Sequence, residues 1–425
     1  MRVLIVNTSE NTGGAAVAAH RLMEALNNNG VKAKMLVAEK TSDSIPVAGM
    51  QQSLAARWHF LWERWCIFCH LRFSRQHLFD IDIANSGFDI TRTPEFREAD
   101  VVHIHWVNQG MLSLKSVRKI LRSGKPVVWT MHDLWPATAI CHYARTCDTF
   151  KTGCHNCPLL PGHGSVNDLA RRVWKRKKRL YAKSNIRFVA CSRWLEGEAK
   201  QSALMKGLKV TSIPNAIDTH TFHPADKRKA RQRLNLPEDK RVILFVSQKV
   251  TDERKGMPYF VEAMQKLIEQ HPDLRDNTVV ALLGSHSDEM AAQMPVPAFP
   301  LGYVANEKSI ASVYNAADAY VLPSLEDNLP NTIMEAMACG VPCVGFRVGG
   351  IPEMIDHQKN GYVARFKDSA DLAEGLYWTL NATADSNALS KNAVTKVAQN
   401  YSQQSVAVRY TEVYNELIAL KRYII

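Results

Sequence analysis

Two carboxylates eight positions apart frame a segment that could hold a sugar and a phosphate. The segment 325–340 reads LEDNLPNTIMEAMACG, with Asp327 in a predicted loop and Glu335 inside a predicted helix that begins at Pro330. Backbone N–H groups at a helix start favour phosphate, and the carboxylates could accept hydrogen bonds from sugar hydroxyls. An acidic cap followed by a surface glutamate is the competing interpretation. The N–H groups expected to be free are those of Asn331, Thr332 and Ile333.

A cluster of four cysteines suggests a metal site. Cys141, Cys147, Cys154 and Cys157 lie within 17 residues and end in a Cys-x-x-Cys pair. Clustered thiols in a reducing interior are usually metal ligands, and four of them favour a structural, tetrahedral Zn²⁺ over an iron–sulfur cluster. His142 or His155 could replace one cysteine, and free thiols are the competing interpretation.

Two stretches combine aromatic and basic residues. Residues 57–79 interleave tryptophan and phenylalanine with arginine, and residues 171–181 hold seven cationic side chains. Such helices suit an anionic membrane surface, with the apolar side in the bilayer and the cations among the headgroups. The alternative is that the first stretch packs on its own domain and the second is solvated.

The elements that must position these residues alternate between strand and helix. β-Branched runs separated by helical patterns predict parallel sheets covered by helices on both faces. We expect an α/β protein with two Rossmann-like domains that face each other across a cleft, where the carboxyl ends of the strands bind ligands. The predicted strands are 2–6, 33–37, 101–104, 126–131 and 187–191, then 241–246, 278–283, 319–322 and 341–346.

Composition narrows the class of protein. The 425 residues are 46% hydrophobic and 22% charged, which excludes a disordered chain. Residues 1–215 hold 31 basic and 16 acidic side chains, whereas the remainder holds 22 and 25, so the first half should meet an anionic partner. No apolar run reaches the roughly 18 residues of a membrane span, and the first residues predict a strand rather than a signal peptide. We therefore expect a cytoplasmic protein.

The domain boundaries follow from the same patterns. We expect an acceptor-side domain formed by residues 1–218 and a C-terminal helix over about 404–425. A charged segment that opens and closes with proline predicts a linker at 219–240, and a nucleotide-sugar-binding domain should fill residues 241–403.

Ordered motifs along the whole chain resemble one family. These are NTGG at 11–14, MHDLWP at 131–136, RKG at 254–256, and ADAYVLPS at 317–324, which leads into the acidic segment. Together they resemble retaining GT-B glycosyltransferases of the glycosyltransferase 4 type (group 1), and the cysteine cluster resembles an insertion in some bacterial members. The family has two glutamates separated by seven residues, whereas here Asp327 takes the first position. Gln248 also stands where many relatives have an arginine.

The resemblance implies roles for several residues. Glu335 would bind the ribose hydroxyls of a nucleotide-sugar, Asp327 the transferred sugar and β-phosphate, Lys255 the diphosphate, and His132 would orient the sugar. Tyr303 would lie beside the nucleobase. Further donor-binding candidates are Gly13, Gly14, Gln248, Arg254, Val304, Glu326, Asn328, Asn331 and Thr332.

The implied reaction moves a hexosyl group from a UDP- or GDP-sugar to an oligosaccharide or polyprenyl-diphosphate-linked acceptor, in cell-surface polysaccharide (capsule) assembly. Lysine and a helix start could neutralise the leaving diphosphate, so we expect catalysis without a metal. Two other classes remain open. One is a GT-B-shaped nucleotide-sugar epimerase, and the other is a basic zinc protein that binds nucleic acid, although the acidic segment argues against nucleic acid.

Overall fold

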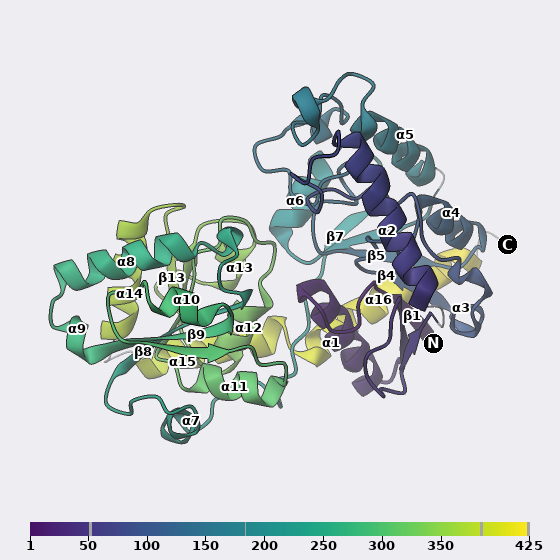
Figure 1. Cartoon of the computed structure of the whole chain (residues 1–425). Helices are drawn as coiled ribbons and strands as arrows, with labels where there is room; N and C mark the ends of the chain where they lie inside the picture. The colour runs from purple at the N-terminus through teal and green to yellow at the C-terminus, as the bar shows by residue number, and fades with distance from the viewer. Residues whose placement is uncertain (51–52, 183, 383–385, 423–425) are drawn as a thin grey trace. The chain divides into compact units, whose positions relative to one another are not determined.

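A seven-stranded parallel sheet forms the centre of the first of two units. The computed structural model describes residues 1–50, 53–182, 184–382 and 386–422 and divides into Met1–Ala216 with Val406–Ile425, and Ile217–Ser405. The strand order is β3-β2-β1-β4-β5-β6-β7, a doubly wound arrangement (Figure 1). The strands are β1 (Arg2–Val6), β2 (Lys32–Val37), β3 (Val47–Gly49), β4 (Val101–Ile104), β5 (Val127–Met131), β6 (Arg187–Ala190) and β7 (Val210–Ser212).

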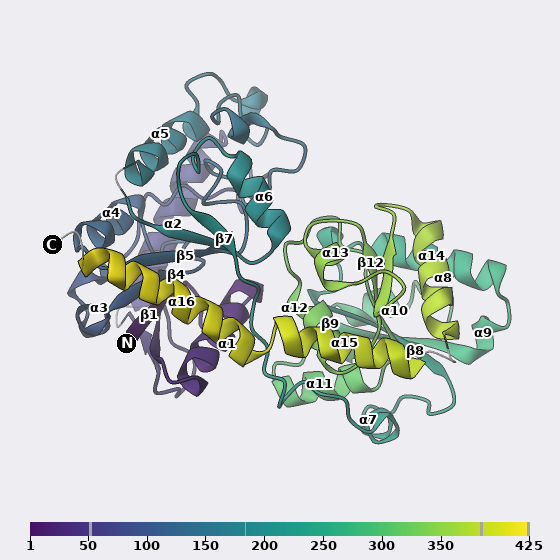
Figure 2. The ribbon, with the colours of Figure 1, turned by 180° about the vertical axis from the view of Figure 1, so that it is seen from behind.

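Helices cover both faces of this sheet. Successive residues of a strand point to opposite faces, and here both sets are apolar. Leu4 and Val6 of β1 join one core cluster, and Val3 and Ile5 join the other. Helices α2, α4, α5 and α6 pack on the first cluster, and α1 and α16 on the second, as Figures 1 and 2 show from opposite sides. The helices are α1 (Gly14–Asn28), α2 (Ser53–His70), α3 (Pro94–Glu98), α4 (Leu114–Arg122), α5 (Leu169–Tyr181), α6 (Arg193–Gln201) and α16 (Gln403–Arg422).

The second unit repeats the design with six parallel strands in the order β10-β9-β8-β11-β12-β13. Helix α8 packs with α14, and α12 packs with α11 and α15. The strands are β8 (Arg241–Lys249), β9 (Thr278–Ser285), β10 (Ala298–Gly302), β11 (Ala319–Leu322), β12 (Cys343–Phe346) and β13 (Gly361–Ala364). The helices are α7 (Lys227–Arg233), α8 (Met257–Gln270), α9 (Leu274–Asn277), α10 (Ser287–Ala291), α11 (Glu307–Asn315), α12 (Asn331–Ala338), α13 (Ile351–Met354), α14 (Ser369–Asn381) and α15 (Ser386–Asn400).

The two sheets confirm the predicted α/β class with two Rossmann-like domains. The segment expected to be a linker, 219–240, lies within the second unit and contains α7. Arg231 is buried there and donates hydrogen bonds to the carbonyl of Ala316 and to Asp318, so this segment packs as part of the domain. The expected C-terminal helix is α16, and residues 423–425 lie outside the described part of the chain.

Candidate active site

An ion cluster lies where β11 ends and α12 begins in the second unit. Asp327 Oδ2 accepts hydrogen bonds from Lys255 Nζ at 2.6 Å and from Ser324 Oγ at 3.2 Å. Arg254 Nη1 lies 3.8 Å from the same oxygen and donates to the carbonyl of Glu326 at 2.9 Å. Burial alone would raise the pKa of Asp327, but the charges of Lys255 and Arg254 outweigh burial and hold that pKa below its usual value. The cluster therefore places two cations beside the ionised Asp327, and Arg254 Nη2 also lies 3.4 Å from Asp252 Oδ2.

Two glycines allow the backbone segments of this cluster to meet. Gly256 has a φ of 75°, and a Cβ there would overlap the carbonyl oxygen of Pro323. Gly349 has a φ of 56°, and a Cβ there would overlap the carbonyl oxygen of Asp327. Only glycine fits such close approaches in the left-handed region. The glycines thus place the lysine-bearing turn Glu253–Lys255 and the loop after β12 against the acidic segment.

The acidic segment leads into α12 as predicted, with one correction. Pro330 occupies the N-cap position, where its side chain offers no hydrogen-bond acceptor. The N–H of Ile333 was expected to be free. It instead donates a hydrogen bond to the carbonyl of Pro330 at 3.2 Å, within the first turn of the helix. Glu335 is 7% exposed, and its Oε2 accepts a hydrogen bond from Tyr314 at 2.9 Å. Tyr314 was not among the predicted residues.

The other donor-binding candidates are spread over strand ends and helix starts. Gln248 is exposed near the end of β8, Tyr303 is 63% exposed after β10, and Val304 is half-buried beside it. Asn328 is buried in the acidic segment, and Asn331 and Thr332 begin α12. Gly13 and Gly14 lie in the first unit, at the N-cap and first residue of α1, where Gly13 has a φ of 90°. Their roles stay predictions.

His132 lies in the first unit, directly after β5. Its Nε2 is 2.9 Å from Nδ1 of His105, and its Nδ1 is 3.4 Å from Sγ of Cys191. Burial lowers the pKa of His132 to about 4, so the ring is neutral near pH 7. His105 was missed by the sequence analysis, although the alternation of His103 and His105 at the end of a predicted strand was a usable signal.

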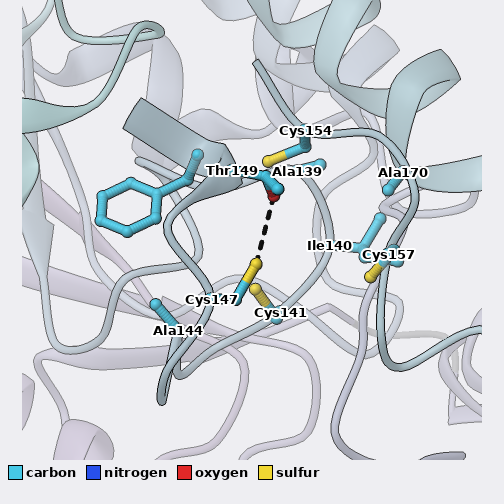
Figure 3. A pocket seen from close by; sticks show the side chains of 10 residues that line it. Ala139, Ile140, Cys141, Ala144, Cys147, Thr149, Cys154, Cys157 and Ala170 are labelled. Atoms are coloured by element: carbon cyan, nitrogen blue, oxygen red, sulfur yellow. Dashed lines mark hydrogen bonds between the residues drawn. The ribbon is translucent and has the colours of Figure 1, made fainter. Parts of the chain in front are cut away.

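The four cysteines of the predicted metal site line one small pocket in the first unit (Figure 3). Its volume is about 20 Å³, which is room for one water-sized particle. Burial raises the pKa of Cys141 to about 11 and those of Cys154 and Cys157 to about 12, while Cys147 Sγ lies 3.1 Å from Thr149 Oγ1. Within the described ranges, no three His, Cys, Asp or Glu side chains are arranged to hold a metal ion. The structure gathers the cysteines but does not form the expected tetrahedral site.

His142, the expected substitute ligand, has other partners. Its Nε2 lies 2.6 Å from Asp82 Oδ2 and its Nδ1 lies 2.7 Å from Asp133 Oδ2. Burial opposes the charged imidazolium, but the two carboxylates outweigh burial and raise the pKa of His142 to about 10. This side chain therefore belongs to an ion network rather than to the cysteine pocket.

The predicted cationic run in α5 is only partly solvated. Lys177 is fully buried, with Nζ donating to the carbonyls of Trp135 at 2.5 Å and Thr138 at 3.1 Å. The run is otherwise exposed at Arg172, Lys175, Arg176, Lys178 and Arg179. Among the helices of the described residues, none is both long and apolar enough to span a bilayer.

Comparison with known proteins agrees with this architecture. Residues 12–221 match the family described as Glycosyltransferase Family 4, and residues 240–382 match Glycosyl transferases group 1. The chain is 30% identical over 221 residues to D-inositol 3-phosphate glycosyltransferase of Thermobispora bispora, covering 49% of this chain and 51% of that protein. It is 29% identical to an uncharacterized glycosyltransferase of Methanocaldococcus jannaschii, covering 48% of this chain and 54% of that one. The chain thus spans about half the length of the curated relatives it matches.

Solved structures share the fold over almost the whole chain. Sucrose-phosphate synthase from Thermosynechococcus elongatus superposes with a TM-score of 0.67 at 17% identity, covering 99% of both chains. Anabaena HepE in complex with UDP-glucose superposes with a TM-score of 0.63 at 16% identity, covering 98% of this chain and 100% of that one. The two family matches together span most of the sequence, and the two sheets agree with the GT-B fold of these neighbours. The chain belongs to the glycosyltransferase 4 family of group 1 glycosyltransferases.

Proposed function

We propose that this protein is a retaining glycosyltransferase that transfers a hexosyl group from a nucleotide-diphosphate sugar to a glycan or lipid-linked acceptor. The observation that carries the proposal is the cluster in which Lys255 and Arg254 lie beside Asp327 at the start of α12. Two cations and the N–H groups of a helix start offer positive charge where a diphosphate needs it. The family match supports the same assignment.

The residues of the second unit divide the work of holding the donor. Lys255 and the start of α12 stabilise the leaving diphosphate as the bond to the sugar breaks, without a catalytic metal. Asp327 and Glu326 accept hydrogen bonds from the transferred sugar. Glu335, anchored by Tyr314, accepts hydrogen bonds from the ribose hydroxyls. His132 belongs to the first unit, and its neutral ring is suited to orient a sugar by hydrogen bonding rather than by charge.

Nucleotide binding tests this assignment. Thermal shift assays of the full chain with UDP, GDP and ADP should show stabilisation by one diphosphate, and UDP is the first to test because HepE, which shares the fold, holds UDP-glucose. Glu335→Gln should weaken that stabilisation because the amide replaces a charged acceptor. Stabilisation by an oligonucleotide but by none of the three nucleotides would contradict the proposal. Release of a free epimerised nucleotide-sugar would support the epimerase instead.

The proposal places the acceptor side of the protein on an anionic membrane surface at the cytoplasmic face. Helix α2 exposes one apolar stripe, formed by Leu54, Trp58, Leu61, Trp62 and Trp65 at 83%, 61%, 50%, 43% and 54% exposure. Leu61 and Trp62 are adjacent, and the other positions follow one another at three or four residues, so all five share one face of the helix. The exposed cations of α5 lie on a helix that packs on the same side of the sheet. Such a surface fits a bilayer that carries a polyprenyl-diphosphate-linked acceptor for polysaccharide (capsule) assembly.

Liposome flotation tests the membrane surface. Vesicles with anionic phosphatidylglycerol should bind the protein, and replacing Trp58, Trp62 and Trp65 by serine should abolish flotation without lowering the melting temperature, since these side chains are exposed. The control variant replaces Val408 and Leu420 of α16, which are also exposed, by serine. Flotation that survives both the tryptophan changes and charge reversal of the α5 cations would contradict this part of the proposal.

The proposal also includes a structural Zn²⁺ held by the four cysteines. Thiolates suit zinc, the pocket has room for one ion, and binding would displace the thiol protons and draw the sulfur atoms together. Metal analysis of the purified protein should find about one zinc per chain. Cys154→Ser with Cys157→Ser should lose the metal, whereas Cys69→Ser, on the exposed surface of α2, should keep it. A protein with neither zinc nor iron would exclude the site.

A further inference from the structure

A second, polar pocket lies at the carboxyl ends of β4 and β5 in the first unit. Its volume is about 220 Å³, which far exceeds that of the cysteine pocket. Trp106 follows β4, Asp133 follows β5, and His142 and Arg145 come from the cysteine-rich segment. Phe79 and Asp80 complete the part of the lining that matters here. Apolar surfaces combined with a few polar groups are typical of a small-molecule site.

A buried chain of ion-pairing side chains reaches this pocket at His142 and Asp133. Arg64 pairs with Asp82, Asp82 with His142, and His142 with Asp133. The four residues are 6%, 0%, 8% and 9% exposed. Two carboxylates stand against one arginine and one imidazole, so the chain adds no surplus of positive charge to the pocket. Breaking such a buried chain is costly, which makes it a rigid support.

This support holds the indole ring of Trp106 in one orientation. Trp106 Nε1 donates to Asp133 Oδ2 at 3.0 Å, and the ring stacks on His142 with centroids 5.7 Å apart. The backbone N–H of Trp106 donates to Asn7 Oδ1 at 3.0 Å. The ring is half-buried and lines the pocket. An aromatic surface fixed in advance costs little entropy when a ligand with an apolar face packs on it.

The charged side chains that line the pocket decide whether it favours a charged or an uncharged ligand. Asp80 and Asp133 of the lining would repel a phosphate or carboxylate ligand. Arg145, the arginine of the lining, already lies 3.7 Å from Asp80, and Asp80 lies 2.6 Å from His77 Nδ1. His142 is enclosed between two carboxylates. The walls thus hold no surplus of positive charge and present acceptors and donors that match sugar hydroxyls.

We propose that this pocket binds an uncharged saccharide unit of the acceptor, with Trp106 as the surface on which the sugar packs and with Asp80 and Arg145 contacting its hydroxyls. Asp133 and His142 are positioning residues because they act through the indole. The inference rests on the proposed glycosyltransferase function and adds the class of acceptor. It sets this chain apart from its relatives named as D-inositol 3-phosphate glycosyltransferases, whose named substrate is a phosphate.

Ligand-observed NMR on the full-length protein tests the pocket. The probes are the methyl glycosides of glucose, galactose, mannose and N-acetylglucosamine, with inositol 3-phosphate as the charged competitor. We expect saturation transfer to at least one glycoside, and about tenfold weaker binding or more in Trp106→Ala. Phe366→Ala, which removes an exposed aromatic side chain of the second unit, should leave glycoside binding unchanged. His142→Gln should weaken glycoside binding less than Trp106→Ala does, because the indole of Trp106 remains and loses only its contact with the imidazole of His142.

The outcomes separate this inference from the proposed function. Binding of none of the four glycosides, equal binding by the wild type and Trp106→Ala, or preference for inositol 3-phosphate would each overturn the inference. If UDP or GDP still stabilises the same protein sample, the glycosyltransferase proposal survives that failure. If Trp106→Ala does not fold, Arg145→Ala at the partly exposed rim replaces it and should also weaken glycoside binding.

Discussion

Removal of the Lys255 ammonium should lower nucleotide binding and sugar transfer more than any other single change in the second unit. In Lys255→Met the chain keeps a side chain of similar length but loses the 2.6 Å hydrogen bond to Asp327. The two side chains are 17% and 12% exposed, so their pair lies between a surface ion pair, worth about 0–1 kcal/mol, and a buried one, whose disruption costs about 3–5 kcal/mol. A charged hydrogen bond to the diphosphate is worth about 1.5–3 kcal/mol.

These values give an expected loss in transfer. About 3 kcal/mol corresponds to roughly 10²-fold in rate or affinity at about 1.4 kcal/mol per factor of ten. The stability loss should be smaller, because Arg254 remains 3.8 Å from Asp327 and still compensates its charge. Lys255→Met should therefore fold and yet bind and transfer about 10²-fold less well.

Calorimetric titration with UDP and GDP measures the nucleotide affinity, and turnover of the matching sugar nucleotide measures the rate of transfer. The control is Lys266→Met on α8, which removes an exposed lysine 3.4 Å from Glu262 and should change neither. Unchanged nucleotide affinity and turnover in Lys255→Met, in a protein with a normal melting curve, would refute the assignment of the diphosphate to this cluster.

Three further changes have expected outcomes. Gly349→Ala forces a Cβ into the carbonyl of Asp327, so turnover should fall more than about tenfold while circular dichroism stays native. His142 has a folded pKa of about 10, so its charge stabilises the first unit fully below pH 6.5 and less as pH rises from 6.5 to 10. The difference in melting temperature between wild type and His142→Gln should therefore shrink from pH 6 to pH 9.5, and a constant difference would contradict this. Arg64→Met leaves Asp82 less compensated and should cost about 3–5 kcal/mol, measured by urea unfolding against the exposed control Arg75→Met.

The central strands could be predicted from the sequence, and the edge strands could not. Central strands such as β4 and β11 are buried on both faces, so they are continuous apolar runs whose bounds match the prediction. The strands without a prediction are β3, β7, β10 and β13, and these are the edges of the two sheets. Three of them are only three or four residues long, and β10 contains a proline, so their patterns are too short or too irregular to predict a strand.

The candidate site divides in a similar way. Asp327 and Glu335 lie in one local motif whose residue types and spacing singled them out, whereas Lys255 was singled out by the resemblance of its RKG motif to the family. The chain from Arg64 through Asp82 and His142 to Asp133 joins three separate segments, and pairing over such distances leaves no periodic signal in the sequence. For the same reason the role of His142 was misassigned to its neighbouring cysteines.

Helix α2 shows why hydrophobicity alone could not settle its orientation. Glu63 and Arg64 are buried beside the core residue Ile67, whereas three tryptophans on the same helix are exposed, so neither face of α2 follows a simple apolar-in, polar-out pattern. Backbone groups of the following loop bind this buried pair, because Glu63 Oε1 accepts the N–H groups of Ile83 and Ala84, and Arg64 donates to the carbonyl of Leu78.

Helix α2 also connects the two binding surfaces proposed for the first unit, which are the polar pocket and the apolar stripe. The loop that Glu63 and Arg64 hold carries Phe79 and Asp80 into the lining of the polar pocket. The opposite face of α2 presents the apolar stripe proposed to enter the membrane. One helix thus fixes the pocket from its buried side and carries the stripe proposed to contact lipid on its exposed side, so an acceptor with a saccharide at one end and a lipid at the other could engage both. Variants that remove the stripe should therefore weaken transfer to a lipid-linked acceptor but not to a free methyl glycoside.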